Sequence, residues 1–131
     1  MTESYSLPDL LEAAAEVRKQ AYAKFSHYKV GAALLAKDGT IFSGCNVENS
    51  SFGLTICAER SAVTAAVAAG RQTFQALALV TEKQGAPCGA CRQVLAEFCG
   101  DEFPIHFAAA EDLGDIKTST LGELLPDAFR F

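Results

Sequence analysis

The chain has 131 residues, half of them apolar, and a formal net charge of −5 at pH 7. This length suits one domain with a sizeable core, which we expect to span residues 1–131. No apolar run reaches transmembrane length and residues 1–20 carry no signal-like pattern, so we expect a cytoplasmic location and no membrane partner. The acidic balance, without a cluster of lysine and arginine, argues against a nucleic acid polymer and favours a small neutral partner.

The first half of the chain predicts a helix, two strands and a second helix. Ser6 and Asp9 form a capping-box-like pair, and an apolar stripe follows at helical spacing, consisting of Leu7, Leu10, Leu11, Ala14, Val17 and Ala21. Strands are predicted at 29–36 and 40–46, joined by the hairpin signal Asp38-Gly39. A loop through 49–54 leads to an Ala-rich helix at 58–69, which Gly70 can end.

The second half predicts three more strands around another helix. The strands are predicted at 74–80, 105–109 and 116–119. A short polar loop and a helix at 88–99 follow the first of them, and a final helical turn is predicted at 121–125. The connection 110–115 is too short for a parallel crossover, so the last two strands should pair antiparallel. The alternation predicts an α/β fold, a three-layer α/β/α sandwich with a mixed five-stranded sheet.

Three of the five cysteines lie where helices are predicted to begin. Cys88 and Cys91 are three residues apart after Pro87, which brings two sulfurs round one metal, and Cys57 opens the Ala-rich helix. A helix N-terminus favours the thiolate form that binds metal. Soft sulfur ligands select zinc, and three ligands leave a fourth position open. Glu59 lies beside the first ligand, where a carboxylate can move the protons of an activated water.

The pattern Cys57-Ala58-Glu59 followed by Pro87-Cys88-Gly89-Ala90-Cys91 resembles the signature of zinc-dependent nucleobase deaminases, with Cys as the first ligand. The sequence is similar to cytidine deaminases of the small, homotetrameric branch that acts on nucleosides. The resemblance extends to FSHYKVGAAL (25–34), GCNVEN (44–49), GLTICAER (53–60) and LLPDAF (124–129). The chain departs from the family at Phe52, where tyrosine is common.

The resemblance implies a complete catalytic set. One Zn²⁺ per chain would be held by Cys57, Cys88 and Cys91, with Glu59 as the proton shuttle and Arg60 donating to sulfur. The implied reaction is hydrolysis of cytidine and 2′-deoxycytidine to uridine and 2′-deoxyuridine, in pyrimidine salvage.

The resemblance also implies the substrate contacts. Phe25 would lie against the pyrimidine ring, and Asn46 and Glu48 on the ribose hydroxyls. The amide of Ala58, at a helix start, is available to the pyrimidine edge. In the implied homotetramer, Phe129 would reach the site of a neighbouring subunit.

Other interpretations of the cysteines remain open. Cys-x-x-Cys alone also fits a thioredoxin-like redox pair, and a structural zinc site would require a fourth protein ligand. The remaining cysteines and both histidines are interpreted as structural, namely Cys45, Cys99, His27 and His106. Two alternative functions are a deaminase of another cytosine nucleoside, such as a blasticidin-type antibiotic, and a non-enzymatic zinc-binding domain. Asn46 and Glu48 favour an ordinary ribose over the first, and Glu59 argues against the second.

Overall fold

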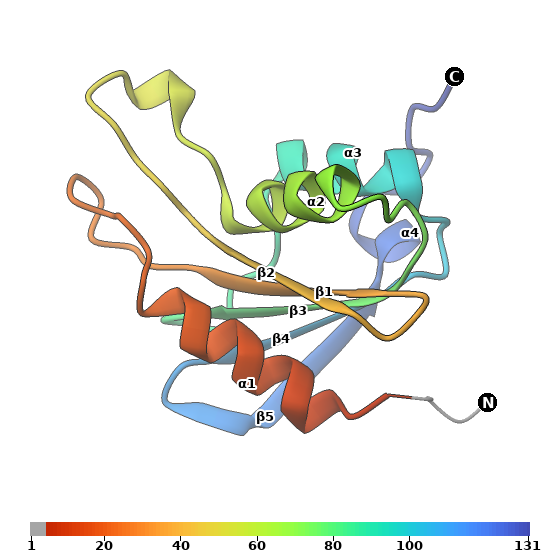
Figure 1. Cartoon of the computed structure of the whole chain (residues 1–131), viewed down its shortest axis with the longest axis horizontal. Coiled ribbons are helices and arrows are strands. Elements are labelled where there is room, and N and C mark those ends of the chain that lie inside the picture. Colours follow the sequence, from red (N-terminus) through yellow and green to blue (C-terminus); the bar gives the residue numbers. More distant parts are fainter. Residues whose placement is uncertain (1–4) are drawn as a thin grey trace.

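A computed structural model describes residues 5–131, so the first four residues of the predicted domain lie outside the described part. A mixed five-stranded sheet lies between helix α1 on one face and helices α2, α3 and α4 on the other (Figure 1). The strand order is β2-β1-β3-β4-β5, with β1 at Gly31–Ala36, β2 at Ile41–Cys45, β3 at Phe74–Thr81, β4 at Pro104–Ala109 and β5 at Asp112–Thr120. The predicted three-layer α/β/α architecture is confirmed.

Helix α1 covers one face of the sheet and spans Leu7–Arg18. The Ser6 side chain accepts a hydrogen bond from the Asp9 backbone N–H at 3.3 Å, as the capping signal predicted. The helix ends before Ala21, which the sequence stripe had included. It ends there because the backbone of Tyr22 pairs with the segment after β2, donating to the Asn46 carbonyl at 2.9 Å.

Helices α2 (Ala58–Ala68), α3 (Gly89–Phe98) and α4 (Leu121–Leu124) cover the opposite face. The α2 side chains Ala62 and Ala66 pack with Leu95 of α3 against Leu77 and Leu79 of β3. Helices α2 and α3 each begin one residue after a cysteine. Burial of their apolar faces therefore brings two helix N-termini to the same side of the sheet.

A glycine sets the distance between β2 and α2. A Cβ atom at Gly44 would lie 2.6 Å from the Ala58 carbonyl oxygen and 2.6 Å from the Ala62 nitrogen. Any larger residue would push the start of α2 away from the sheet. Because Cys57 immediately precedes α2, Gly44 helps to fix the position of this cysteine.

Strands β3 and β4 are parallel and all other neighbours in the sheet are antiparallel. The predicted antiparallel pairing of the last two strands is therefore confirmed. The last strand is longer than its predicted span of 116–119, because it pairs with β4 from Asp112 onward. A 3₁₀ turn at Phe52–Leu54 lies within the predicted loop 49–54. None of the helices in the described region is long and apolar enough to cross a membrane.

Candidate active site

Three sulfurs meet between the starts of α2 and α3. Cys57 is the N-cap residue of α2, Cys88 is the N-cap of α3, and Cys91 lies in the first turn of α3. Their Sγ atoms all lie within 4.8 Å of one another, and those of Cys88 and Cys91 are 3.5 Å apart. Neither Cys45 nor Cys99 belongs to this group, which agrees with their interpretation as structural cysteines.

A guanidinium group balances the charge of the sulfurs. Nη2 of Arg60 donates to Cys57 Sγ at 3.4 Å and to the Thr55 carbonyl at 3.1 Å. Hydrogen bonding from Cys91, together with Arg60, lowers the pKa of Cys57 to about 5. The pKa of Cys91 is raised, because its thiol donates the hydrogen bond to Cys57 and because it is buried. The set can therefore form thiolate at neutral pH beside a fixed positive charge.

The donor set fits a zinc ion with an open position. It offers three soft sulfur ligands, and the group within residues 5–131 contains no fourth protein ligand. The buried Nε of Arg60 has no hydrogen-bond partner among the described atoms, so this guanidinium has donor capacity left beside the sulfurs. Three thiolates around a dication would carry a net negative charge, which Arg60 would reduce.

Glu59 is buried beside the sulfurs and is only 4% exposed. Burial, reinforced by the charge of Cys57, raises the pKa of Glu59 to about 7. A carboxyl group with a pKa near neutral can both accept and release a proton during a reaction.

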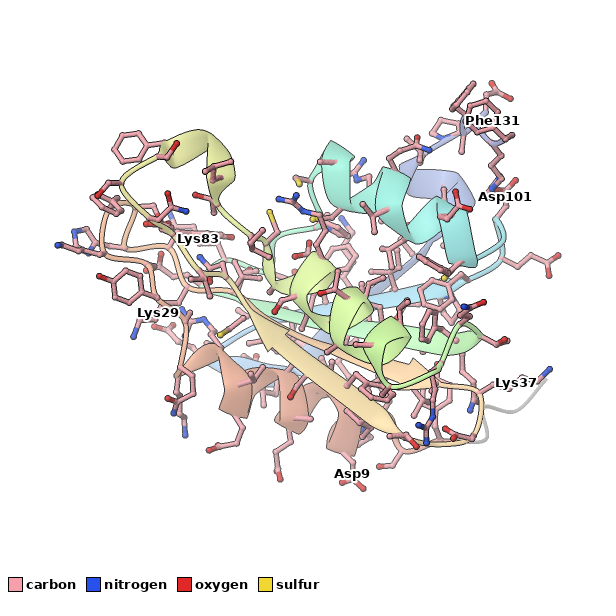
Figure 2. All side chains as sticks on the ribbon, turned by 45° about the horizontal axis from the view of Figure 1, so that its top comes forward. Asp9, Lys29, Lys37, Lys83, Asp101 and Phe131 are labelled. Carbon is pink, nitrogen blue, oxygen red and sulfur yellow. The ribbon has the colours of Figure 1, made fainter. Side chains whose placement is uncertain are left out.

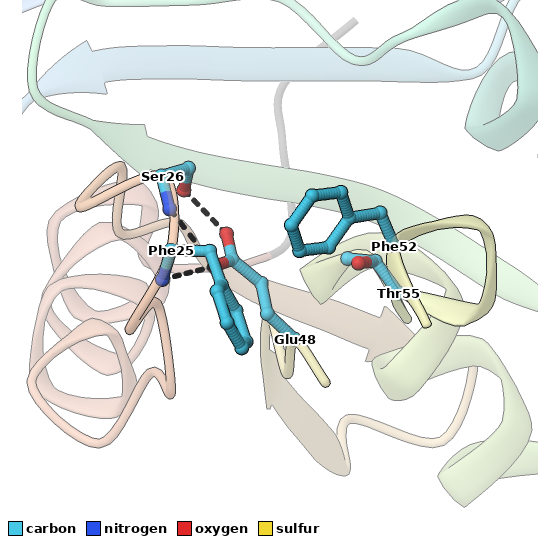
Figure 3. A pocket seen from close by; sticks show the side chains of 5 residues that line it. All are labelled: Phe25, Ser26, Glu48, Phe52 and Thr55. Carbon is cyan, nitrogen blue, oxygen red and sulfur yellow. Dashed lines mark hydrogen bonds between the residues drawn. The ribbon is translucent and has the colours of Figure 1, made fainter. Parts of the chain in front are cut away.

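Cys57, Cys88 and Glu59 line the inner end of a cleft, and Cys91 is buried next to them. The inner hollow of the cleft has a volume of about 260 Å³ and is lined by Ser26, Tyr28, Val30, Asn46, Glu48, Thr55, Cys57, Ala58, Glu59, Leu79, Thr81, Ala86 and Cys88. An outer hollow of about 350 Å³ is lined by Phe25, Ser26, Glu48, Phe52 and Thr55 (Figure 3). Because the two hollows share three residues, they form one continuous cleft with Glu48 near its middle.

Glu48 is held by the segment that precedes β1. Its Oε1 accepts from the backbone N–H groups of Phe25 and Ser26 at 2.9 and 3.0 Å, and its Oε2 accepts from the Ser26 hydroxyl (Figure 3). These hydrogen bonds, those from Ser26 above all, lower the pKa of Glu48. The carboxylate is therefore ionised at neutral pH. Since a carboxylate offers about four acceptor sites, one remains for a ligand hydroxyl.

Asn46 is likewise engaged with the backbone. Its Oδ1 accepts from the Val30 N–H at 2.9 Å and its Nδ2 donates to the Tyr28 carbonyl at 2.8 Å. The amide keeps one N–H and one acceptor position for a ligand. Asn46 and Glu48 therefore both shape the segment 25–30 and lie in the cleft.

The aromatic side chains divide between the two hollows. The ring of Phe25 packs edge-on against that of Phe52, with centroids 5.2 Å apart, in the outer hollow. Tyr28 lines the inner hollow, and a Cβ atom at Gly85 would lie 2.9 Å from its hydroxyl. Sequence reasoning missed Tyr28, together with Ser26, Thr55 and Thr81. The signal was present, because Ser26 and Tyr28 belong to the same FSHYKVGAAL stretch.

The C-terminal tail lies away from the cleft of its own chain. Gln93 of α3 donates to the Phe129 carbonyl at 2.8 Å, and the rings of Phe129 and Phe131 pack at 5.1 Å. Phe129 is 65% exposed. The tail and the turn Phe52–Leu54 lie at opposite ends of the molecule in both views (Figures 1 and 2).

Comparison with known proteins agrees with this geometry. Residues 5–107 match the family described as the cytidine and deoxycytidylate deaminase zinc-binding region. A cytidine deaminase of Sporosarcina psychrophila is 49% identical over 92% of this chain and 88% of its own length, and one of Halalkalibacterium halodurans is 46% identical over 92% and 91%.

Solved structures give the same result. A crystal structure of cytidine deaminase from Burkholderia pseudomallei superposes with a TM-score of 0.89 at 46% identity, covering 95% of this chain and 100% of that one. That from Mycobacterium tuberculosis gives a TM-score of 0.85 at 41% identity, covering 98% and 100%. The chain therefore belongs to the cytidine and deoxycytidylate deaminase family, whose zinc-binding region it matches, and its Cys57, Cys88 and Cys91 cluster could hold the metal ion.

Proposed function

We propose that the chain hydrolyses cytidine and 2′-deoxycytidine to the corresponding uracil nucleosides and ammonia, as one catalytic domain over residues 1–131. One observation carries the proposal. The structure brings together a buried carboxyl group and three thiols that could hold a metal ion at the inner end of one cleft, and an ionised carboxylate with an amide near its middle. The relatives reported above are named cytidine deaminases, which supports the same substrate here.

Glu59 carries the protons of the reaction. Cys57, Cys88 and Cys91 would hold the zinc ion, which would supply the Lewis acidity that activates the attacking water. Glu59 takes a proton from that water and gives it to N3 of the pyrimidine, so that the ring accepts addition at C4. Glu59 then takes the remaining proton from the new C4 hydroxyl and delivers it to the amine as the C4–N bond breaks, which leaves the uracil carbonyl and ammonia. The backbone N–H groups of Ala58 and Glu59, at the start of α2, have no intrahelical partners and are available to the pyrimidine edge.

The order of residues along the cleft orients the nucleoside. With C4 beside Glu59, the sugar lies toward Glu48 and Asn46, whose remaining hydrogen-bonding capacity suits hydroxyl groups. The contact of Phe25 with the pyrimidine stays a prediction, because Phe25 lines the outer hollow and Tyr28 lines the inner one. Neither hollow has a lysine or arginine in its lining, so an uncharged nucleoside fits better than a phosphorylated one.

An ultraviolet assay with four substrates tests the proposal. We expect turnover of cytidine and 2′-deoxycytidine, and very poor turnover of free cytosine and of cytidine monophosphate. Cytosine carries the whole reacting group but lacks the sugar whose binding orients the ring. Comparable kcat/KM for cytosine and cytidine would contradict the sugar assignment, and a preference for a blasticidin-type nucleoside would contradict the substrate.

We further propose a homotetramer in which the tail completes the cleft of a neighbour. Phe129 is exposed and lines neither hollow of the cleft of its own chain, so a cleft that it closes would belong to another copy. Beside the outer hollow, Tyr22, Val47 and Ile56 are joined by β-bridges and are 51%, 44% and 44% exposed, which offers an apolar surface to a second copy.

Light scattering and a truncation test the assembly. We expect a tetramer, and we expect deletion of residues 127–131 to lower turnover far more than zinc content. An active monomer, or a truncated form with unchanged kinetics, would contradict the proposal.

We also propose a cytoplasmic location and a role in pyrimidine salvage. The five free cysteines support this location, because free thiols suit a reducing compartment.

A further inference from the structure

Arg92 joins the C-terminal segment to the loop before α3 that carries Pro87 and Cys88, called here the zinc-binding loop. Its Nε donates to the Pro87 carbonyl at 2.6 Å, and its Nη1 donates to the Leu124 carbonyl at 2.6 Å. Its backbone N–H also donates to the Cys88 carbonyl at 3.0 Å. We propose that Arg92 is a positioning residue that holds the zinc ligand Cys88 in place and anchors the C-terminal segment beside the site.

Cys88 needs such support more than the other two ligands. Cys91 is buried and Cys57 is partly buried with a hydrogen bond from Arg60, whereas Cys88 is exposed. As the N-cap of α3 it makes no side-chain capping hydrogen bond, so its sulfur is left for the metal. The direction of its Cα–Cβ bond therefore depends on the peptide groups on either side. Arg92 holds both of them, one through its side chain and one through its backbone.

The other arm of Arg92 reaches the end of α4. The Leu124 carbonyl is at the C-terminus of that short helix, where it has no partner within the helix. A guanidinium suits this position because it carries charge and presents several N–H donors in a rigid fork. Leu124 lies just before the tail that ends at Phe131. One side chain thus links the loop that carries Cys88 to the origin of the tail.

Two neighbouring contacts provide controls. Gln93 donates to the Phe129 carbonyl at 2.8 Å, and Arg130 donates to the Ala96 and Cys99 carbonyls at 3.0 and 3.1 Å. Figure 2 shows Asp101, which pairs with Arg130, beside Phe131 at one end of the molecule. Both contacts fix the tail to α3, and neither involves the zinc-binding loop. Variants at Gln93 and Arg130 therefore loosen the tail alone.

The proposal predicts a specific effect on zinc retention. Zinc leaves when a ligand detaches, and the exposed Cys88 is the ligand that a chelator reaches first. Loss of residues that support metal ligands typically lowers metal affinity about 10–100-fold. Arg92→Lys keeps the charge and the helix, but a single ammonium replaces the two-armed fork. It should therefore fail to restore both contacts.

The experiment compares the zinc-loaded forms of R92A, R92K, Q93A and R130A with the wild type. Zinc transfer to a chromogenic chelator is timed, hydrogen exchange of residues 124–131 is measured, and the sulfur-to-metal absorption of the cobalt-substituted forms is recorded. We expect R92A and R92K to release zinc about 10–100-fold faster, with altered cobalt absorption and faster exchange of the tail. Q93A and R130A should show faster exchange with a zinc release rate within about twofold of the wild type.

Two results would overturn the proposal. One is that both R92K and R92A release zinc at the rate of the wild type. The other is release from Q93A as fast as from R92A, because the tail alone would then control the metal. If R92A does not fold, R92K decides the question, with near-ultraviolet circular dichroism as the check on folding. The measurements use no substrate, so their outcome is independent of the proposed reaction.

Discussion

The two ends of the cleft are built in different ways. At the inner end, Cys57, Cys88 and Cys91 lie at helix starts, and their sulfurs are grouped so that they could hold a metal ion. Toward the outer end, Glu48 and Asn46 use most of their hydrogen-bonding capacity on the backbone of residues 25–30. Under the proposed function, the inner residues would act on the reactants directly, whereas the outer ones would act partly by holding a loop in shape. Changes at the inner end should reduce turnover, and changes toward the outer end should weaken substrate binding.

The largest effect is expected at Glu59. Glu59→Gln keeps the shape of the side chain but cannot carry a proton, so kcat for cytidine should fall by about 10⁴-fold, the upper range for general acid–base groups. Elemental analysis should find one zinc per chain in the variant, as in the wild type. A Gln variant that keeps a tenth of the wild-type rate would remove Glu59 from the mechanism.

An intermediate effect is expected at Tyr28. Comparison with Phe25 tests which of the two aromatic residues contacts the pyrimidine. Stacking of a base on an aromatic side chain contributes about 1–3 kcal/mol, so Tyr28→Leu should lower kcat/KM for cytidine about 10–100-fold. The same change should also reduce the residual turnover of cytosine. Phe25→Leu should affect cytidine more than cytosine, because its ring lies in the outer hollow. If Phe25→Leu damages both substrates equally, Phe25 is the residue that contacts the pyrimidine.

The smallest effect is expected at Ser26. Its hydroxyl donates to Glu48 and accepts from the Tyr28 N–H at 3.0 Å. Ser26→Ala should raise KM for cytidine a few-fold and leave kcat nearly unchanged, because the carboxylate keeps its two backbone donors.

The same variant has a pH signature. Ser26 lowers the pKa of Glu48 in the folded state, so this interaction stabilises the fold above the unfolded pKa of about 4.3 and is lost as pH falls through the folded pKa. Ser26→Ala should therefore lower Tm at pH 7 relative to the wild type, and the difference should shrink toward pH 3. A Tm difference that is equal at both pH values would show that Ser26 does not act through the charge of Glu48.

Much of the fold was predictable because its signals are local. Ser6 caps α1 as predicted, and Gly39 adopts a positive φ of 93° in the hairpin turn. The grouping of Cys57, Cys88 and Cys91 was equally predictable, because cysteines at helix starts with this spacing are typical of metal sites. The extent of β5 could not be predicted, because Asp112, Gly114 and Asp115 resemble turn residues. Pairing with β4 along an exposed edge overrides their local preference.

The outer end of the cleft was harder to predict for a related reason. Sequence identified Asn46 and Glu48 as polar residues of interest, but their partners are backbone groups about 20 residues away, which no spacing rule reveals. Those hydrogen bonds hold a turn in which His27 has a φ of 60°, an uncommon conformation for a residue other than glycine. The same turn sends Phe25 and Tyr28 into different hollows.

The distribution of the zinc ligands along the chain also has a thermodynamic consequence. Cys88 and Cys91 are close in sequence, but Cys57 precedes them by roughly 30 residues, so a metal bound to all three closes a loop of that size. By the chain-entropy relation, closing such a loop in the unfolded chain would cost about 4 kcal/mol, a cost that the folded chain does not bear, so an ion would bind the folded state far more tightly and stabilise it. The loop encloses β3, the middle strand of the sheet, which pairs with both β1 and β4. An ion held by all three cysteines would therefore tie the centre of the fold together, in addition to its proposed part in the chemistry.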